Sequence, residues 1–228
     1  FLVKFSQEAK IYNAALKTRS VEVLYRVCEI KNQESGIMNQ GRRLSRSFYL
    51  RPATAVAKDL LCKYLVRRTR AGRMSGKIID VEAYPAFTDQ VSHGNRRTAR
   101  TEVMYSAGGR AYVYLVYGMH YQFAVVVSRP AIPEVVFIRA VIPTEGIEIM
   151  KRNFRRPVKK FNDLTRSPGN LCKAFGIDLK MYGVELTGNK LWVEDRGDLV
   201  KPRDIKASKR IGIDPRLKGA GRKLRFCI

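Results

Sequence analysis

Four apolar runs in the middle of the chain constrain its fold more than any other feature. Each is rich in β-branched and aromatic residues, and Gly or Pro separates it from the next. The runs are residues 76–84 (GKIIDVEAY), 111–117 (AYVYLVY), 122–128 (QFAVVVS) and 134–142 (EVVFIRAVI). Runs of this composition and length are typical of β-strands. They predict one mainly antiparallel sheet near the middle of a 228-residue chain.

Helical patterns flank the predicted sheet. Apolar residues at helical spacing predict one or two helices within 7–33 and an amphipathic helix over 54–66 that runs into a strand. Between them, the Gly- and Ser-rich stretch 32–47 predicts a basic loop. After the sheet, we expect Thr144 to cap a helix through 145–154, and Ser167 to begin a helix that Gly176 ends. This pattern favours a single α+β domain over 49–228, preceded by a basic helical extension over 1–48.

The positive charge of the chain points to a polyanionic partner. Lysine and arginine number 44 against 20 acidic residues, which gives a net charge of +24. Nucleic acid is the commonest partner of so basic a protein. Two runs, 151–166 and 201–225, carry much of the excess. One such run is often only solvated surface, whereas two runs flanking an apolar sheet favour a phosphate-binding face.

The cysteines and histidines indicate no metal site and no other cofactor. The four cysteines are far apart, and the chain has only two histidines, so no zinc-binding spacing exists. Free cysteines indicate a reducing compartment. The longest apolar stretch, 111–127, is interrupted by polar residues and is not a membrane span. We therefore expect an intracellular monomer without a membrane partner, located in the nucleus if the organism is eukaryotic.

Two charged residues lie in predicted strands that should otherwise be dry. Alternation along 76–84 places Asp80, Glu82 and Tyr84 on one face and Ile79, Val81 and Ala83 on the other. Arg139 interrupts the apolar run 134–142. A buried charge is costly unless it is paired, so both charges need partners. A pair between them has two interpretations. It could be a structural pair that fixes strand register, or it could hold a carboxylate ionised as a general base acting on water.

Aromatic residues accompany this carboxylate. Tyr84 shares its face with Glu82, His93 follows in a polar loop, and Tyr112 and Tyr114 lie two apart on one strand face. Taken singly, strand tyrosines are most often core residues, and a lone histidine is more often packed or exposed than functional. Together on a basic protein they favour nucleic acid, because aromatic faces stack on bases while basic flanks hold phosphates.

Five sequence blocks follow one another along the chain: VEAYPAFTDQVSH, AYVYLVYGMHY, FIRAVIPTEGIEIM, SPGNLCKAFGI and KRIGI…KLRF. In order and spacing they resemble the alkyladenine (methylpurine) DNA glycosylase family. Each alone is a weak signal, but five in order are specific. The resemblance extends from about Tyr49 to the C-terminus and leaves residues 1–40 outside. It implies an α+β fold in which a curved, mainly antiparallel sheet carries a protruding β-hairpin and is surrounded by helices.

The resemblance also implies catalytic roles for individual residues. Glu82 matches the carboxylate that activates a water for attack on C1′ of the target nucleotide. Arg139 matches the arginine that helps to hold this water, and Ile211 lies where a backbone carbonyl completes its binding. Asp80 is expected to give structural support only. No lysine occupies the place of a Schiff-base nucleophile, so the resemblance implies a monofunctional hydrolase that leaves an abasic site.

Further residues match those that hold an extruded base. Tyr84, His93 and Tyr114 match the residues that enclose it. Tyr117 matches the hairpin-tip aromatic that enters the minor groove, with Met104 near it. A base inside a duplex cannot be attacked until it is flipped out, which explains the need for stacking residues and a wedge. The implied partner is double-stranded DNA with damaged purines, of the 3-methyladenine, 7-methylguanine, hypoxanthine or ethenoadenine type, as in base excision repair.

One position departs from the family pattern. Ala124 stands where the family usually has an asparagine that is credited with rejecting guanine through its exocyclic amine. Its loss removes a device for excluding wrong bases. We therefore expect weaker discrimination against guanine-type bases, or a different lesion range.

Three other functions compete with this one. A non-catalytic nucleic-acid-binding or lesion-recognition protein would explain the charge and the tyrosines, but it leaves Glu82 and Arg139 unexplained. A helix–hairpin–helix glycosylase is suggested by GIDPRLKGAG at 212–221, yet no catalytic aspartate on a helix follows it. An RNA-modifying enzyme would need a phosphate-binding glycine loop or metal ligands, and the sequence shows neither.

Phosphate contacts are the least constrained of these predictions. The N-terminus of the helix expected at Ser167, with Gly169 in its first turn, could present backbone N–H groups to a phosphate. The remaining candidates are basic residues near the predicted hairpin: Arg96, Arg97, Arg100 and Arg110.

Overall fold

The structure is a computed structural model that describes residues 41–154, 157–158 and 161–228. Its strands are β1 (Arg42–Arg43), β2 (Tyr64–Thr69), β3 (Gly72–Tyr84), β4 (Ala111–Val116), β5 (His120–Val127), β6 (Glu134–Glu145), β7 (Leu191–Asp195), β8 (Lys206–Ser208) and β9 (Arg225–Cys227). The α-helices are α3 (Arg46–Tyr49), α4 (Ala53–Leu60), α5 (Ile147–Arg152) and α6 (Pro168–Phe175). Short 3₁₀ turns are η1 (His93–Asn95), η2 (Glu102–Tyr105), η3 (Phe161–Leu164), η4 (Leu179–Met181) and η5 (Pro202–Asp204).

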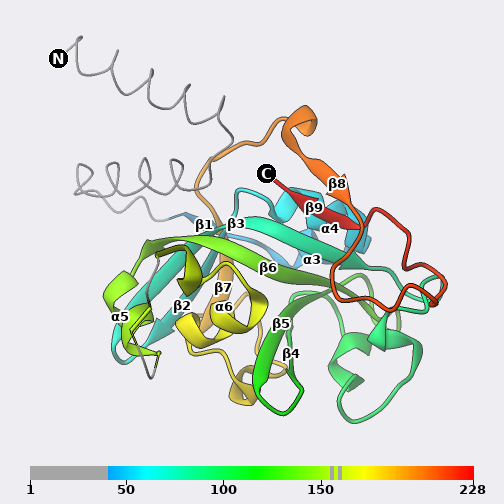
Figure 1. Cartoon of the computed structure of the whole chain (residues 1–228), viewed down its shortest axis with the longest axis horizontal. Coiled ribbons are helices and arrows are strands. Elements are labelled where there is room, and N and C mark those ends of the chain that lie inside the picture. The colour runs from blue at the N-terminus through cyan, green and yellow to red at the C-terminus, as the bar shows by residue number, and fades with distance from the viewer. Residues whose placement is uncertain (1–40, 155–156, 159–160) are drawn as a thin grey trace. The chain divides into compact units, whose positions relative to one another are not determined.

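The strands form one open antiparallel sheet. Their order is β1-β7-β2-β3-β6-β5-β4, and β9, itself paired with β8, joins along β3 (Figure 1). All paired strands run antiparallel. The predicted α+β class and its four predicted strands are therefore confirmed, and the four strands form the β3–β6–β5–β4 part of the sheet.

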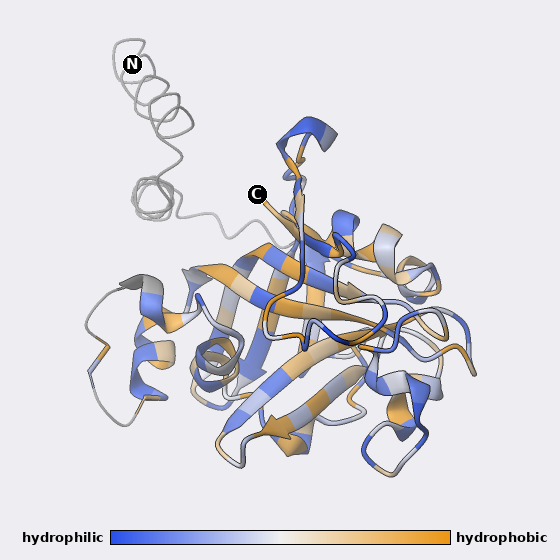
Figure 2. Cartoon of the chain, turned by 45° about the vertical axis from the view of Figure 1, so that its right-hand side comes forward, coloured by the Kyte–Doolittle hydropathy of each residue, from blue (hydrophilic) through white to orange (hydrophobic). Residues whose placement is uncertain are grey.

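One face of this sheet forms the main hydrophobic core. Val125 of β5 and Ile138 of β6 lie there, and α4 and α6 pack over them with buried residues such as Leu60 and Phe175. Figure 2 shows the hydrophobic colour concentrated on the strands and the hydrophilic colour on many of the loops. Burying a side chain of this size stabilises the fold by about 1.5–3 kcal/mol.

The opposite face carries a second, smaller cluster. Side chains that alternate with those of the main core, such as Tyr112, Ala124 and Phe137, pack there against Met104 of η2. This cluster is rich in aromatic residues, and Tyr84 and Tyr114 pack on its border. The face of the sheet that lacks α4 and α6 is thus the one that carries the tyrosines of the sequence pattern.

Strand β3 contains a bulge that simple alternation does not predict. Ile78, Val81 and Ala83 are fully buried in the main core, whereas Ile79 is only half-buried. The predicted shared face of Ile79, Val81 and Ala83 therefore holds for Val81 and Ala83 but not for Ile79. The register between β3 and β6 shifts on both sides of Asp80. An extra residue in one strand exchanges the faces of the residues beyond it. The first half of β3 then pairs with β2, and the segment around Val81 pairs with β9.

The helix predicted to run into a strand within 54–66 is confirmed, because α4 ends at Leu60 and β2 begins at Tyr64. Between them, the Cys62 N–H donates to Ile78 O of β3 at 3.0 Å. The next helix starts differently from its prediction. Thr144 is not a helix cap: it lies in β6, where its hydroxyl hydrogen-bonds Ser75 at 2.7 Å, and Gly146 precedes α5 instead. The predicted helix from Ser167 to Gly176 is confirmed as α6.

The N-terminal predictions lie mostly outside the described residues. The helices expected within 7–33, and the loop expected at 32–47 as far as residue 40, are among them. In the rest of that loop, Arg42 and Arg43 pair with β7, and α3 begins at Arg46. Pairing with a neighbouring strand has therefore overridden a loop-like composition. No helix in the described part of the chain has the length and hydropathy needed to cross a membrane.

Candidate active site

Four neighbouring strands place one row of side chains on the smaller-cluster face. Glu82 of β3 pairs with Phe137 of β6, Phe137 pairs with Ala124 of β5, and Ala124 pairs with Tyr112 of β4. Directly paired residues in antiparallel strands point to the same side of the sheet. The alternation that was read from the sequence therefore brings a carboxylate, a small residue and a tyrosine onto one surface.

A cavity of about 530 Å³ lies over this row. Its lining includes Tyr84, Val91, His93, Arg100, Tyr112, Tyr114, Leu115, Val116, Tyr117, Gln122, Ala124, Val135, Phe137, Arg139, Pro168, Ile211, Gly212 and Ile213. The sheet supplies the floor, and the loops around His93 and Ile211 supply walls. The volume lies within the range of small-molecule binding sites, and the lining is mainly apolar and aromatic.

Glu82 lies beneath the cavity and is fully buried. Its Oε1 accepts a hydrogen bond from the Ile211 N–H at 2.8 Å and lies 3.1 Å from Nη1 of Arg139. Its Oε2 accepts a hydrogen bond from the Tyr84 hydroxyl at 2.9 Å. Removing an unpaired carboxylate from water is expensive, and these donors offset that cost.

Arg139 joins Glu82 to a second carboxylate. Its Nε lies 3.8 Å from Oδ2 of Asp80. Asp80 in turn accepts a two-point contact from Arg225 of β9, at 3.0 and 2.7 Å. The predicted pairing of Glu82 with Arg139 is confirmed, and the charges form a chain from the cavity floor to the C-terminal strand. Asp80 contacts Arg139 and Arg225, which fits the structural support expected of it.

Ile211 contacts Glu82 through its main chain, because its N–H donates to the carboxylate. Ile211 also lines the cavity. It therefore lies at the site, and the expected binding of a water by its backbone carbonyl stays a prediction.

Tyr84 borders the cavity beside Glu82. Burial, followed by the negative charge of Glu82, raises the pKa of the Tyr84 hydroxyl far above its usual range. The hydroxyl is therefore protonated at neutral pH and serves as the donor to Glu82. Its ring forms part of the cavity wall.

His93, Tyr112 and Tyr114 form a compact aromatic group on the opposite side of the lining. Tyr112 and Tyr114 are stacked with ring centroids 4.8 Å apart, and His93 meets Tyr114 edge-on at 5.0 Å. His93 Nδ1 lies 3.1 Å from the Tyr112 hydroxyl. Desolvation, and then the charge of Arg100, lowers the pKa of His93, while burial raises the pKa of Tyr112 to about 12. Neutral forms of both therefore face the cavity at pH 7.

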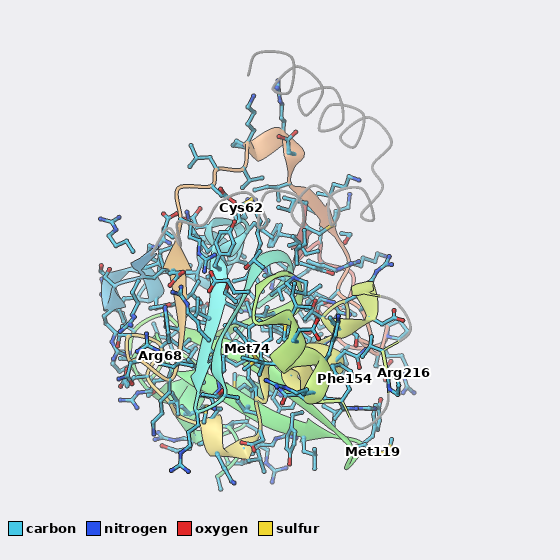
Figure 3. All side chains as sticks on the ribbon, turned by 90° about the vertical axis from the view of Figure 1, so that its left-hand side faces the viewer. Cys62, Arg68, Met74, Met119, Phe154 and Arg216 are labelled. Carbon is cyan, nitrogen blue, oxygen red and sulfur yellow. The ribbon has the colours of Figure 1, made fainter. Side chains whose placement is uncertain are left out.

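The hairpin between β4 and β5 presents Tyr117 at its tip. Tyr117 is 87 % exposed and has φ +52°, and Gly118 follows with φ +67°. Met104, expected near it, is instead fully buried in the smaller cluster and cannot reach a partner from there. The methionine at the tip is Met119, which is 72 % exposed and lies at the edge of the molecule (Figure 3). The position of Met119 close to the turn in the sequence could have identified it.

The arginines predicted to contact phosphates differ in whether an acidic residue already pairs with them. Arg97 is bound by Glu102 at 2.9 and 2.6 Å, and Arg110 is paired with Glu185, so neither cation is unpaired. Arg96 is exposed and Arg100 lines the cavity. Neither of these two forms an ion pair with a described residue.

At the expected helix N-terminus, Ser167 caps α6 by accepting from the Asn170 N–H at 3.3 Å. Gly169, in the first turn, faces His120 of the hairpin.

Sequence reasoning missed several polar residues around the cavity. Gln122 accepts a hydrogen bond from the Tyr114 hydroxyl at 2.9 Å. Asp89 and Arg210 form a fully buried ion pair and carried no signal of their own in the sequence. Within the part of the chain that the structure describes, His, Cys, Asp and Glu nowhere form a group of three that could hold a metal ion.

Comparison with known proteins assigns the sequence to a family. The sequence profile described as methylpurine-DNA glycosylase matches residues 47–228. Three bacterial proteins assigned by name as 3-methyladenine DNA glycosylases are similar over most of their length. They come from Desulfitobacterium hafniense (41 % identical, covering 76 % of this chain and 88 % of the relative), Clostridium acetobutylicum (43 %, 75 % and 87 %) and Oceanobacillus iheyensis (44 %, 75 % and 84 %).

These bacterial relatives give no support to a nuclear location. The profile match covers the strands, helices and loops that build the cavity, as well as every predicted site residue. The chain belongs to the methylpurine-DNA glycosylase family and is thus an enzyme of the DNA glycosylase class that acts on DNA.

Proposed function

We propose that this chain is a monofunctional DNA glycosylase of base excision repair. It extrudes an alkylated or deaminated purine from duplex DNA and hydrolyses the N-glycosidic bond with a water that Glu82 activates. The observation that carries the proposal is the position of Glu82. It lies fully buried at the base of an aromatic cavity, with Arg139 and the Ile211 N–H on one oxygen.

The proposed reaction breaks one bond and forms another. The water oxygen bonds to C1′ of the target nucleotide as Glu82 takes its proton, and the electrons of the C1′–N9 bond leave with the purine. General base catalysis of this kind contributes about 10²- to 10⁴-fold. An alkylated purine cation becomes neutral as it leaves and needs no acid. A neutral lesion such as hypoxanthine must be protonated on its ring.

In the protein without DNA, groups of the protein itself already occupy both carboxylate oxygens of Glu82. Both carboxylate oxygens already accept hydrogen bonds, with Tyr84 on Oε2. A water that approaches C1′ must share Oε2 with the Tyr84 hydroxyl or displace it. Arg139 and the Ile211 N–H remain on Oε1, so Glu82 stays oriented during this exchange.

The remaining cavity residues suit an extruded purine. Tyr84 and the stacked pair Tyr112 and Tyr114 offer aromatic faces, and a stacked base gains about 1–3 kcal/mol. His93, which is neutral at pH 7, offers a ring nitrogen to the edge of the base. Its neutrality avoids repulsion of a cationic purine.

Tyr117 is proposed as the wedge that takes the place of the extruded nucleotide. It is a flat, largely apolar side chain at the end of a narrow hairpin. Minor-groove proteins insert side chains of this kind to compensate for lost stacking. Met119, beside it at the tip, is a second apolar side chain available for the same groove.

The lesion range is proposed to include guanine-type bases. Ala124 lines the cavity and leaves room where a larger polar side chain would project. The relatives are assigned by name as 3-methyladenine DNA glycosylases, so methylated adenine is the first substrate to test. Hypoxanthine and 1,N6-ethenoadenine test the deaminated and bridged purines.

A base-release assay distinguishes the proposal from a non-catalytic lesion-binding protein. Excess protein is mixed with end-labelled duplexes that carry one of these lesions, and free base and alkali-labile sites are measured over time. We expect base release, with strands that break only after alkali treatment. Tight lesion binding without release would favour the non-catalytic protein, and strand cleavage without alkali would contradict a monofunctional mechanism.

A further inference from the structure

A second buried ion pair lies beside the candidate site and has no part in the chemistry above. Nη1 and Nη2 of Arg210 contact the two carboxylate oxygens of Asp89 at 2.6 and 3.0 Å. Both side chains are fully buried. Two-point guanidinium–carboxylate contacts fix orientation as well as distance. This pair is therefore suited to holding its surroundings in one geometry.

The Arg210 guanidinium also contacts strand β3 at the two residues after Glu82. Nη1 donates to the carbonyl oxygen of Ala83 at 3.2 Å, and the guanidinium carbon lies 4.6 Å from the centre of the Tyr84 ring. Nη2 donates to Gly219 O at 3.1 Å. A side chain at Gly219 would collide with the Asp89 carboxylate. One guanidinium thus joins β3, the loop after it and the C-terminal loop.

Ile211 follows Arg210 directly, and its N–H holds Glu82. The segment from 209 to 224 has no helix or strand, so no ladder of backbone hydrogen bonds fixes the direction of this N–H. In a loop, other contacts must fix the direction of a backbone N–H that donates to a functional group. The anchored neighbour Arg210 supplies them.

Asp89 organises the opposite wall of the cavity. Its Oδ1 accepts from the Val91 N–H at 3.2 Å, and its carbonyl oxygen accepts from the Ser92 N–H at 3.0 Å and from the Asn95 side chain at 2.6 Å. These bonds shape the turn that carries His93. The ion pair therefore connects both loop walls of the cavity to the strand that carries the carboxylate.

We propose that Asp89 and Arg210 are positioning residues for the glycosylase reaction. They set the direction of the Ile211 N–H toward Glu82, the plane of the Tyr84 ring and the place of His93. The inference rests on the proposed function and adds to it two residues that touch neither substrate nor reacting atoms. A misplacement of about 1 Å at the reacting groups, caused by a change far from the chemistry, can lower the rate about 100-fold.

The test compares Asp89→Asn with a matched change elsewhere. Glu194 of β7 is also a buried carboxylate, 2.6 Å from Arg73 and 2.8 Å from Arg196, and it does not line the cavity. Glu194→Gln makes the same carboxylate-to-amide change. Single-turnover base release is measured over a range of protein concentrations for the parent and both variants. This gives a maximal rate and a half-saturating concentration, and thermal unfolding is recorded in parallel.

We expect Asp89→Asn to lower the maximal rate at least about 10-fold, while its half-saturating concentration changes less than about threefold. The activity of Glu194→Gln should also change less than about threefold. The inference is overturned if folded Asp89→Asn retains the parental rate, or if both variants lose activity equally. Arg210→Lys keeps the charge but loses the two-point contact. It is expected to have an intermediate rate, and it decides the matter by the same criterion if Asp89→Asn does not fold. A parent that releases no base overturns the proposed function and this inference together.

Discussion

Tyr84 has two roles in this account that substitution can separate. Its ring lines the cavity and is proposed to stack on the extruded base, and its hydroxyl donates to Glu82. Tyr84→Ala removes both, and we expect single-turnover base release to slow about 5- to 150-fold, which corresponds to the 1–3 kcal/mol of one stacked base. Tyr84→Phe keeps the ring and frees Oε2 of Glu82, so its rate should lie much closer to that of the parent. Equal losses in the two variants would contradict the stacking role.

Ala124 is the residue whose substitution tests the lesion range. Ala124→Asn places a polar amide at the cavity surface, where we expect it to disfavour the amine at C2 that guanine-type bases carry and adenine-type bases lack. We expect the ratio of 7-methylguanine to 3-methyladenine excision to fall about fivefold or more. Competition between two lesion duplexes in one reaction measures this ratio directly. An unchanged ratio, with both bases still released, would exclude Ala124 as a determinant of selectivity.

At the scale of single residues, the sequence predicts a functional residue best where its type is unusual for its place, such as a charge inside an apolar strand. Glu82 and Arg139 stand out because a charge inside an apolar run requires a partner, and each has the other. Asp89 and Arg210 do not stand out, because charges in loops are ordinary and 121 positions separate the two. Met104 and Met119 flank the same aromatic stretch, and only the fold shows which of them is buried.

At the scale of elements, the β4–β5 hairpin should matter for excision from duplex DNA and not for excision from a single strand. Tyr117→Ala removes the wedge without touching the core, since the side chain is 87 % exposed. Unstacking a base step costs a few kcal/mol, so we expect excision from duplex DNA to slow about 10-fold or more. Excision of the same lesion from a single strand should change little, because nothing needs to be displaced. A parallel loss on both substrates would place Tyr117 in the base pocket instead.

The long elements are those that the sequence predicts well. β5 and β6 carry enough β-branched residues to be recognised, and α6 has a serine cap and a terminal glycine. β7 and β9 are short, and their pairing with β2 and β3 depends on neighbours far along the chain. The bulge at Asp80 is likewise a property of the β3–β6 pair, which a pattern read from one strand does not contain.

At the scale of the whole molecule, the net charge of +24 should make DNA binding strongly dependent on salt. Each phosphate contact releases a counterion, and four contacts already imply about a 100-fold loss of affinity between 50 and 200 mM salt. Titration of labelled undamaged duplex by fluorescence anisotropy measures the slope. Arg96→Ala should reduce that slope by about one if Arg96 touches a phosphate, whereas Arg97→Ala should change it less, since Arg97 is bound by Glu102. A slope near zero would argue against a phosphate-binding face.

The central claim concerns one carboxylate, and one comparison tests it. Single-turnover base release is measured for the parent, Glu82→Gln and Asp80→Asn, two carboxylate-to-amide changes on the same side of β3 beside Arg139. We predict that Glu82→Gln lowers the rate at least about 100-fold while lesion-duplex affinity stays within about threefold, because it loses the general base. Asp80→Asn keeps the general base and removes only a partner of Arg139, so its rate should lie between that of Glu82→Gln and that of the parent. If Glu82→Gln releases the base as fast as the parent, Glu82 does not activate the water and the account is wrong.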